Sequence, residues 1–139
     1  MPFMAQYKKK EWIMQRIELV KQIIKRKKQL GITIENLAKL SGVSIRTINR
    51  LLKNEDVKLS TVEAVTNLLG LDFAGNEIVS IDELKKQRAK EKALYLASIV
   101  QATSTLEKQG LEEESINKIV SMYENEFLYG DYKNRLWVA

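Results

Sequence analysis

The stretch LAKLSGVSIRTINRLL, residues 37–52, has the pattern of two short helices joined by a tight turn. Gly42 stands where the first helix should end, because glycine tolerates the left-handed backbone conformation that often closes a helix. Ser44 follows in the N-cap position, where its hydroxyl can accept a hydrogen bond from a free amide of the next helix. Ile48 and Leu51 are three residues apart, so we expect both to face a core.

The spacing of apolar residues predicts helices on both sides of this stretch. Upstream, a helix should run from Trp12 to a stop at Gly31. Downstream, Ser60 and Glu63 form the Ser-x-x-Glu pattern of a capping box, ahead of a helix that Gly70 should close. The apolar face of the first of these helices is expected to contain Ile13, Ile17, Val20 and Ile24.

Residues 73–79 contain a glycine and an asparagine and are expected to connect two parts of the chain, with a short extended piece at Ile78 and Val79. A second capping box, Ser80 with Glu83, predicts a long helix that ends near Gly110. A last helix should span about residues 112–129. Two apolar stripes are expected to pack these helices as a hairpin: Leu84, Leu96, Ile99, Thr103 and Leu106, and Ile116, Ile119, Val120, Tyr123 and Phe127.

The sequence therefore predicts an all-α fold: a helix-turn-helix bundle, then a helical hairpin with one long helix. We place the first domain at residues 1–72, the connector at 73–79 and a C-terminal helical region at 80–139. Near the C-terminus, Trp137 is expected to pack over the hairpin and Arg135 to pair with an acidic face; the alternative is a tail that holds a partner.

Composition excludes several classes of function. The chain has no cysteine and no histidine, so it lacks thiol nucleophiles, the usual general base and the commonest metal ligand. No pair of carboxylates stands out either, and we expect neither an enzyme nor a cofactor or metal. No apolar run reaches the ~18 residues that cross a bilayer. We therefore expect a soluble cytoplasmic protein that does not contact membranes.

Charge is divided unevenly along the chain. Residues 1–72 carry 14 lysines and arginines against 7 acidic residues, whereas residues 73–139 carry 9 against 11. A basic half joined to a mildly acidic half indicates two surfaces with different partners, and nucleic acid suits the basic one. The alternative is chance variation among Lys/Glu-rich helix surfaces.

Residues 31–70 resemble the lambda-repressor-like family of helix-turn-helix proteins. The turn Ser-Gly-Val-Ser between two short helices is typical of this motif. Ala38, Gly42, Val43 and Ile48 stand where the family places these residue types. The family often has glutamine directly after the first cap of the motif, where it holds a phosphate, whereas this chain has Ile34.

The resemblance implies that the second helix of the motif enters the major groove of double-stranded operator DNA. An arginine there can donate two hydrogen bonds to one guanine, and an asparagine can form hydrogen bonds with adenine. A single motif of this kind binds weakly, so we expect a homodimer on DNA. The residues expected at base edges are Ile45, Arg46, Asn49 and Arg50, and those expected at phosphates are Thr33, Lys39, Ser44, Lys53, Asn54 and Lys58. The alternative is that the arginines only form a solvated helix face.

The second half contains a weaker resemblance. The segment VSIDELKKQRAKEKALYLASIVQATSTLEKQGLEEE, residues 79–114, and the ending NRLW, residues 134–137, are similar to the mobile mystery protein A family. That family combines a helix-turn-helix with a helical C-terminal region and is typically encoded beside a Fic-domain protein. The matching residues are Arg88, Ala89, Thr103, Leu106, Glu107, Gln109, Leu111, Arg135, Leu136 and Trp137.

This second resemblance implies an inhibitory helix. Fic enzymes transfer AMP from ATP to hydroxyl groups, and the motif Ser/Thr-x-x-x-Glu-Gly/Asn of an antitoxin commonly silences them. Thr103 and Glu107 match the first and fifth positions, one helical turn apart, whereas Lys108 replaces the small sixth residue. The implied role of Glu107 is to pair with an arginine of the toxin that otherwise holds the ATP γ-phosphate. The alternatives are a solvated Glu107 and a plain dimeric repressor whose C-terminal helices only dimerise.

Overall fold

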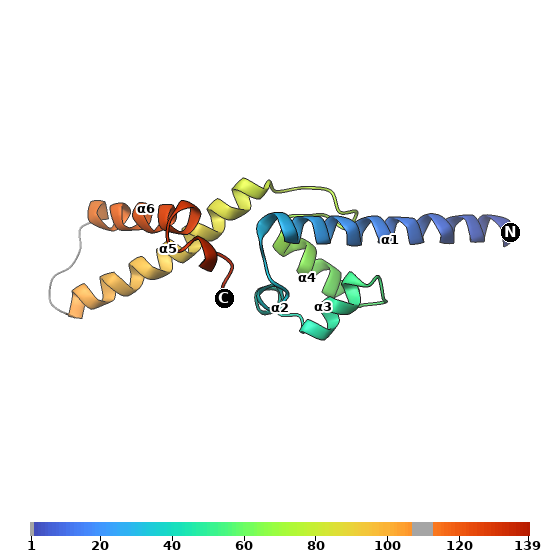
Figure 1. Ribbon diagram of the computed structural model, residues 1–139, viewed down its shortest axis with the longest axis horizontal. Helices are drawn as coiled ribbons and strands as arrows, with labels where there is room; N and C mark the ends of the chain where they lie inside the picture. Colours follow the sequence, from blue (N-terminus) through green and yellow to red (C-terminus); the bar gives the residue numbers. More distant parts are fainter. Residues whose placement is uncertain (1, 107–112) are drawn as a thin grey trace. The chain divides into compact units, whose positions relative to one another are not determined.

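The computed structural model describes the backbone of residues 2–106 and 113–139, and the side chains of residues 16–103 and 113–139. The described chain is helical, which confirms the all-α expectation, and its only non-helical pairing is an isolated bridge between Leu71 and Glu77. The elements are α1 (Pro2–Leu30), α2 (Ile34–Ser41), α3 (Ile45–Leu52), α4 (Leu59–Leu69), α5 (Ile81–Leu106), α6 (Glu113–Tyr129) and the short 3₁₀ helix η1 (Lys133–Arg135), as Figure 1 shows.

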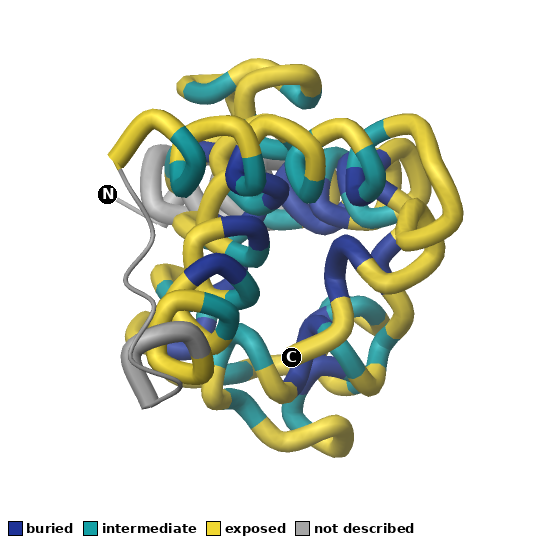
Figure 2. The backbone as a smooth tube through the Cα atoms, turned by 90° about the vertical axis from the view of Figure 1, so that its left-hand side faces the viewer, coloured by how far each residue is buried: buried dark blue, intermediate teal, exposed yellow. Residues whose placement is uncertain are grey.

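The chain divides into two compact units. The first ends at Ile81 and holds α1 to α4, and the second spans Asp82–Val138 and holds the hairpin. Along the helices of both units, short buried stretches alternate with exposed ones (Figure 2). Each helix therefore presents one face to a core, as amphipathic helices do.

Helix α1 differs from the expectation in its start and in its buried face. It begins at Pro2 rather than Trp12, and proline is favourable in the first turn of a helix. Its buried stripe contains Leu19, Ile23 and Leu30, whereas Ile17 and Ile24 are 39% and 42% exposed. The expected face was therefore right at Val20, which is buried, and wrong at Ile17 and Ile24, whereas the side chain of Ile13 lies outside the described residues.

Arg26 explains why the buried stripe of α1 was missed. It lies on that stripe and is only 4% exposed, so the apolar pattern is interrupted by a charged residue. Its guanidinium donates to the carbonyl of Val79 at 3.1 Å and forms an ion pair with Glu77 at 3.2 Å. A buried charge is tolerated when it is paired and hydrogen-bonded in this way.

The caps of α2 and α3 confirm the expectations for this part of the chain. The hydroxyls of Thr33 and Ser44 accept hydrogen bonds from the amides of Asn36 and Thr47, both at 3.2 Å. Each such cap typically stabilises its helix by about 1 kcal/mol. Gly42 ends α2 with φ = 72°, a left-handed conformation that favours glycine.

The predicted capping box at Ser60 and Glu63 was wrong. Helix α4 begins at Leu59, and Lys58 occupies the N-cap without a side-chain hydrogen bond. Ser60 therefore lies inside the first turn, two residues after the N-cap position. Gly70 does close the helix, with φ = 69°.

The segment after α4 turns back on α1 instead of forming an extended piece. The amides of Ile78 and Val79 both donate to the carbonyl of Gly70, at 2.9 and 3.1 Å, so the expected extended pair is absent there. The Asp72 carboxylate accepts hydrogen bonds from backbone amides of this loop, those of Asn76 and Ala74 at 2.9 Å. The Asn76 amide is the largest cause that lowers the pKa of Asp72 below its usual value.

Helices α5 and α6 cross obliquely (Figure 1) and contact each other through Ala93, Ala97 and Val120, as expected for the hairpin. The α6 stripe is confirmed, because Val120 and Phe127 are buried and the other three residues lie half-buried. The α5 stripe was wrong at Ile99 and Thr103, which are exposed, whereas Leu84 and Leu96 lie half-buried and the side chain of Leu106 lies outside the described residues. The fully buried residues of the described part of α5 are alanines. These are Ala89, Ala93 and Ala97. Ala93 and Ala97 form one cluster with Val120 of α6, and Ile116, Ile119 and Tyr123 pack against it.

The C-terminal tail folds back on the hairpin, so the expected packing of Trp137 is confirmed. Arg88 donates to the carbonyls of Leu136 at 2.9 Å and Val138 at 2.8 Å. Lys92 donates to the carbonyl of Arg135 at 2.8 Å, and burial lowers the pKa of Lys92 below its usual value. Two cations on α5 thus hold the tail by its backbone.

Candidate nucleic-acid interface

Helix α3 separates its core residues from its surface residues cleanly. Ile48 is fully buried and Leu51 nearly so, which confirms the expected core face. Arg46 lies exposed on the opposite side, Ile45 is exposed in the first turn, and Asn49 is half-buried between the two faces. The side chains expected at base edges therefore project from the outer face of the helix, where a DNA groove can reach them.

The N-terminus of α3 is electrostatically suited to an anion. It has no acidic residue in its first turn, so the partial positive charge of the helix dipole there is not neutralised by its own side chains. Ser44 is exposed, and its hydroxyl lies 2.8 Å from that of Thr47. Backbone amides and hydroxyls at a helix N-terminus are common ligands of DNA phosphates.

Arg50 has internal partners that the sequence does not reveal. Its guanidinium donates to the carbonyl of Asp56 at 2.9 Å and forms an ion pair with Glu55 at 3.4 Å. Both partners belong to the loop between α3 and α4. A bidentate contact to guanine would require Arg50 to give up these partners first, whereas Arg46 is in no ion pair found among the described side chains.

A groove brings together several of the residues expected at phosphates or bases. It runs between the turn of the motif and the start of α4, and Ser44, Arg50 and Lys58 line it. Ser60 also lines this groove as an exposed hydroxyl. Ser60 is not among the expected phosphate contacts because its spacing from Glu63 suggested a capping role.

The other residues expected at phosphates lie outside this groove. Thr33 and Lys39 are exposed at the start and end of α2, and Lys53 is exposed at the C-cap of α3. Asn54 differs from them: its backbone is left-handed, with φ = 60°, and its side-chain oxygen is buried. Asn54 thus belongs to the structure of the α3–α4 turn more than to the exposed surface.

Comparison with known proteins agrees with this geometry. Residues 23–76 match the helix-turn-helix family, a range that includes α2, α3 and α4. The N-terminal part of the chain is therefore a helix-turn-helix domain of the kind that binds DNA, and the protein is a DNA-binding transcription regulator. Neither the curated proteins nor the solved structures gave a match to the chain. No comparison supports the resemblance of the second half to the mobile mystery protein A family.

Of the two residues expected to inhibit a toxin, Thr103 and Glu107, the structure describes only Thr103. Thr103 is exposed near the end of α5, where its hydroxyl donates to the carbonyl of Ile99 at 3.0 Å. Glu107 and Lys108 lie outside the described residues. Among the described helices, none has the length and apolar character needed to cross a membrane.

Proposed function

We propose that this protein is a sequence-specific operator-binding repressor that reads the major groove with the outer face of α3. The observation that carries the proposal is the division of α3, in which fully buried Ile48 fixes the helix with Ile45 and Arg46 facing outward. Arg46 and Asn49 supply the hydrogen-bonding groups that distinguish guanine and adenine. Arg50 joins them at base edges once it leaves Glu55.

The groove beside α3 supplies the phosphate contacts of the proposed complex. Ser44, Lys58 and Ser60 bind one DNA strand there, and Thr33, Lys39 and Lys53 extend the contact along the backbone. Contacts of this kind position the protein without reading sequence. We propose a homodimer on DNA, because two half-sites raise both affinity and specificity.

Selection from a randomised double-stranded DNA library tests the proposal directly. The full chain is expected to enrich one short sequence in two copies, with centres about 10 base pairs or a multiple of that apart. Its affinity for that site should fall with salt while the preference over random DNA persists. Enrichment of no sequence would leave only salt-dependent, non-specific binding and would refute the proposal.

For the second unit we propose an antitoxin role, in which the end of α5 inhibits a Fic-type AMP-transferase. The support is the Thr103–Glu107 spacing in the sequence and the exposure of Thr103, whose side chain is accessible to a partner. Glu107 then pairs with an active-site arginine of the toxin. Repression and inhibition in one chain let the protein control its own operon.

Glu107→Gln tests the antitoxin role. The wild-type chain is expected to suppress AMP transfer by the Fic-domain enzyme encoded beside it, measured with labelled ATP. Loss of a charge-assisted contact of about 1.5 to 3 kcal/mol should weaken inhibition by the variant about tenfold or more. Glu113→Gln, an exposed acid at the start of α6, is the matched control and should inhibit normally. Equal inhibition by wild type and Glu107→Gln, or no neighbouring Fic enzyme, contradicts the role.

A further inference from the structure

The second half of α5 carries no charge. Residues 93–106 read ALYLASIVQATSTL, whereas residues 81–92 contain eight charged residues. The solvent side of a helix in a globular protein is ordinarily rich in charged and polar residues. The change in composition within one helix therefore indicates two different environments along its length.

Within the described part of the chain, α6 covers one side of this half-helix. Ala93 and Ala97 are buried there and form a cluster with residues of α6. Leu94, Tyr95 and Ile99 are 49%, 67% and 47% exposed. At about 3.6 residues per turn, Tyr95 and Ile99 lie on the side opposite to Ala93 and Ala97. The side of α5 that faces away from α6 thus exposes large apolar side chains.

The exposed residues on that side form one stripe, here called the outer face of α5. It consists of Leu94, Tyr95, Ser98, Ile99 and Ala102, which are all exposed. Tyr95, Ile99 and Ala102 follow one another at spacings of four and three residues. Two helices that pack along a shared seam use this spacing. The outer face therefore has the pattern of a surface that receives another helix.

The lack of charge on the outer face suits a second copy of the same chain. A contact between two copies about a two-fold axis uses the same surface of both, so like charges come close together and repel. The exposed face of α1 shows the difference. There Ile17 and Ile24 alternate with the exposed lysines Lys21 and Lys28. Two copies of that face would repel each other, whereas two copies of the outer face of α5 would not.

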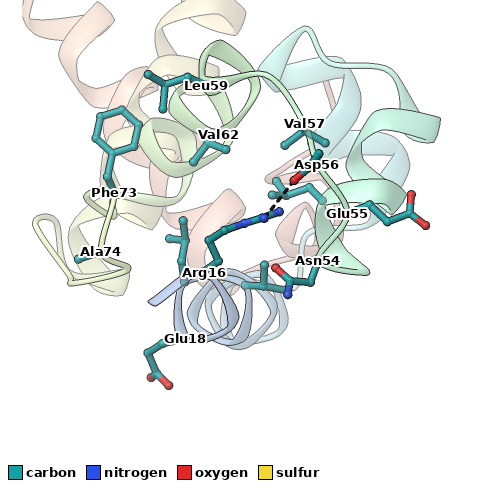
Figure 3. A pocket seen from close by; sticks show the side chains of 13 residues that line it. Arg16, Glu18, Asn54, Glu55, Asp56, Val57, Leu59, Val62, Phe73 and Ala74 are labelled. Atoms are coloured by element: carbon teal, nitrogen blue, oxygen red, sulfur yellow. Dashed lines mark ion pairs between the residues drawn. The ribbon is translucent and has the colours of Figure 1, made fainter. Parts of the chain in front are cut away.

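The apolar pocket of the N-terminal unit is also less suited to a second copy. Leu59 and Phe73 line it and are 69% and 52% exposed. Arg16 extends from α1 into this pocket, and its guanidinium lies 3.0 Å from the Asp56 carboxylate (Figure 3). A protein surface seated there would cover this ion pair, and removing charges from water costs free energy. The outer face of α5 contains no charged group that would have to be covered.

The area of the outer face predicts a weak contact in solution. A stable complex buries about 800 Å² on each partner. Tyr95, the largest of the five residues, is 67% exposed and contributes on the order of 100 Å². Five residues of this kind offer less than a stable complex needs. Two copies should therefore associate weakly when free and more strongly when one DNA molecule holds both, because DNA raises their effective concentration.

We propose that the outer face of α5 is the surface through which two copies of this protein associate. This inference rests on the homodimer proposed above and names its contact. Tyr95 and Ile99 of one copy pack against the outer face of the other, with Ser98 and Ala102 between them as small residues. The uncharged half of α5 is then covered on one side by α6 and on the other by the second copy.

Sedimentation velocity of the full chain over a series of concentrations tests the contact without DNA. The wild type is expected to pass from monomer to dimer below about 100 µM. Tyr95→Glu brings like charges together and should weaken the dimer about tenfold or more. Met122→Glu is the matched control, because it adds the same charge to a 52% exposed residue of α6. It should dimerise as the wild type does.

A second variant keeps this test independent of charge. Ile99→Ser removes exposed apolar surface without adding a charge and should also weaken the dimer, while circular dichroism shows an unchanged helical content. A wild type that stays monomeric up to about 100 µM overturns the proposal. So does a Tyr95→Glu or Ile99→Ser chain that is folded and dimerises like the wild type.

DNA binding separates this inference from the proposed repressor. A duplex with one half-site should bind the wild type and Tyr95→Glu equally, whereas a duplex with both half-sites should bind only the wild type cooperatively. Equal cooperativity overturns the contact and leaves operator reading intact. A chain that dimerises through α5 but selects no DNA sequence refutes the repressor and retains the contact. If Tyr95→Glu dimerises normally but no longer suppresses AMP transfer, the outer face binds the toxin and the proposal is overturned.

Discussion

Replacing Ile48 by alanine is expected to lower the free energy of unfolding of the N-terminal unit by about 2 to 5 kcal/mol. Ile48 has no exposed surface and lies on the core face of α3. Removing its methyl and methylene groups loses the favourable free energy of burying them away from water. It also leaves a cavity that the close-packed neighbours fill only in part. Urea titration with hydrogen-exchange mass spectrometry of residues 31–70 measures the loss for this unit alone.

Ile45→Ala is the matched control for this measurement. It deletes the same groups from the same helix one turn earlier, but Ile45 is 46% exposed. The control should change the free energy of unfolding by no more than about 0.5 kcal/mol, as surface substitutions usually do. If both variants lost the same stability, α3 would have to be rotated, and Arg46 would then not project from its outer face.

The orientation of α3 was predictable because its signals are local. Ser44 caps the helix from the adjacent residue, and Gly42 closes the preceding helix with a conformation that few other residues adopt. Between these fixed ends, the spacing of Ile48 and Leu51 leaves one rotation that buries both. Sequence reading is strongest where a few neighbouring residues determine both the ends of a helix and its face.

Features set by distant partners were not predictable in this way. The buried face of α1 depends on Arg26, whose partners Glu77 and Val79 lie about fifty residues further along the chain. The sequence marks Arg26 as a surface residue, so an alternative apolar stripe was preferred. Arg50 presents the same difficulty, since its contacts with the α3–α4 loop depend on how that loop folds.

In the hairpin, the buried face of α5 could not be predicted because the sequence offers two plausible apolar faces. In α5 the larger residues Leu96 and Ile99 suggested the core face, whereas the structure buries Ala93 and Ala97. Hydrophobicity alone favours the larger side chains. The face that is buried depends instead on the partner helix, here α6, which places Val120 against Ala93 and Ala97.

The second large effect is expected from Arg46→Ala in operator binding. Arg46 is exposed in the first turn of α3, and no described side chain forms an ion pair with it. In the proposed complex its guanidinium can therefore bind a base edge without first losing an ion-pair partner. A bidentate arginine–guanine contact discriminates by about 1 to 3 kcal/mol. The affinity for the selected operator should therefore fall about 10- to 100-fold, with relaxed preference at one base pair. Fluorescence anisotropy with operator variants measures both quantities.

Arg50→Ala separates base reading from general positive charge, because it removes the same charge one turn further along α3. To contact a base, Arg50 must first break its contacts with Glu55 and with the Asp56 carbonyl. The free energy of losing these contacts reduces the net gain from the new contact with DNA. We expect a smaller loss than for Arg46→Ala, spread more evenly over operator and random DNA, since its charge still favours phosphates. Stability should be nearly unchanged in both variants, because both side chains are exposed. The opposite result would be a larger loss of affinity for Arg50→Ala than for Arg46→Ala, with relaxed specificity only in Arg50→Ala. It would mean that Arg50 leaves its loop contacts when DNA binds. The contacts of the unbound protein would then not determine which arginine reads the base.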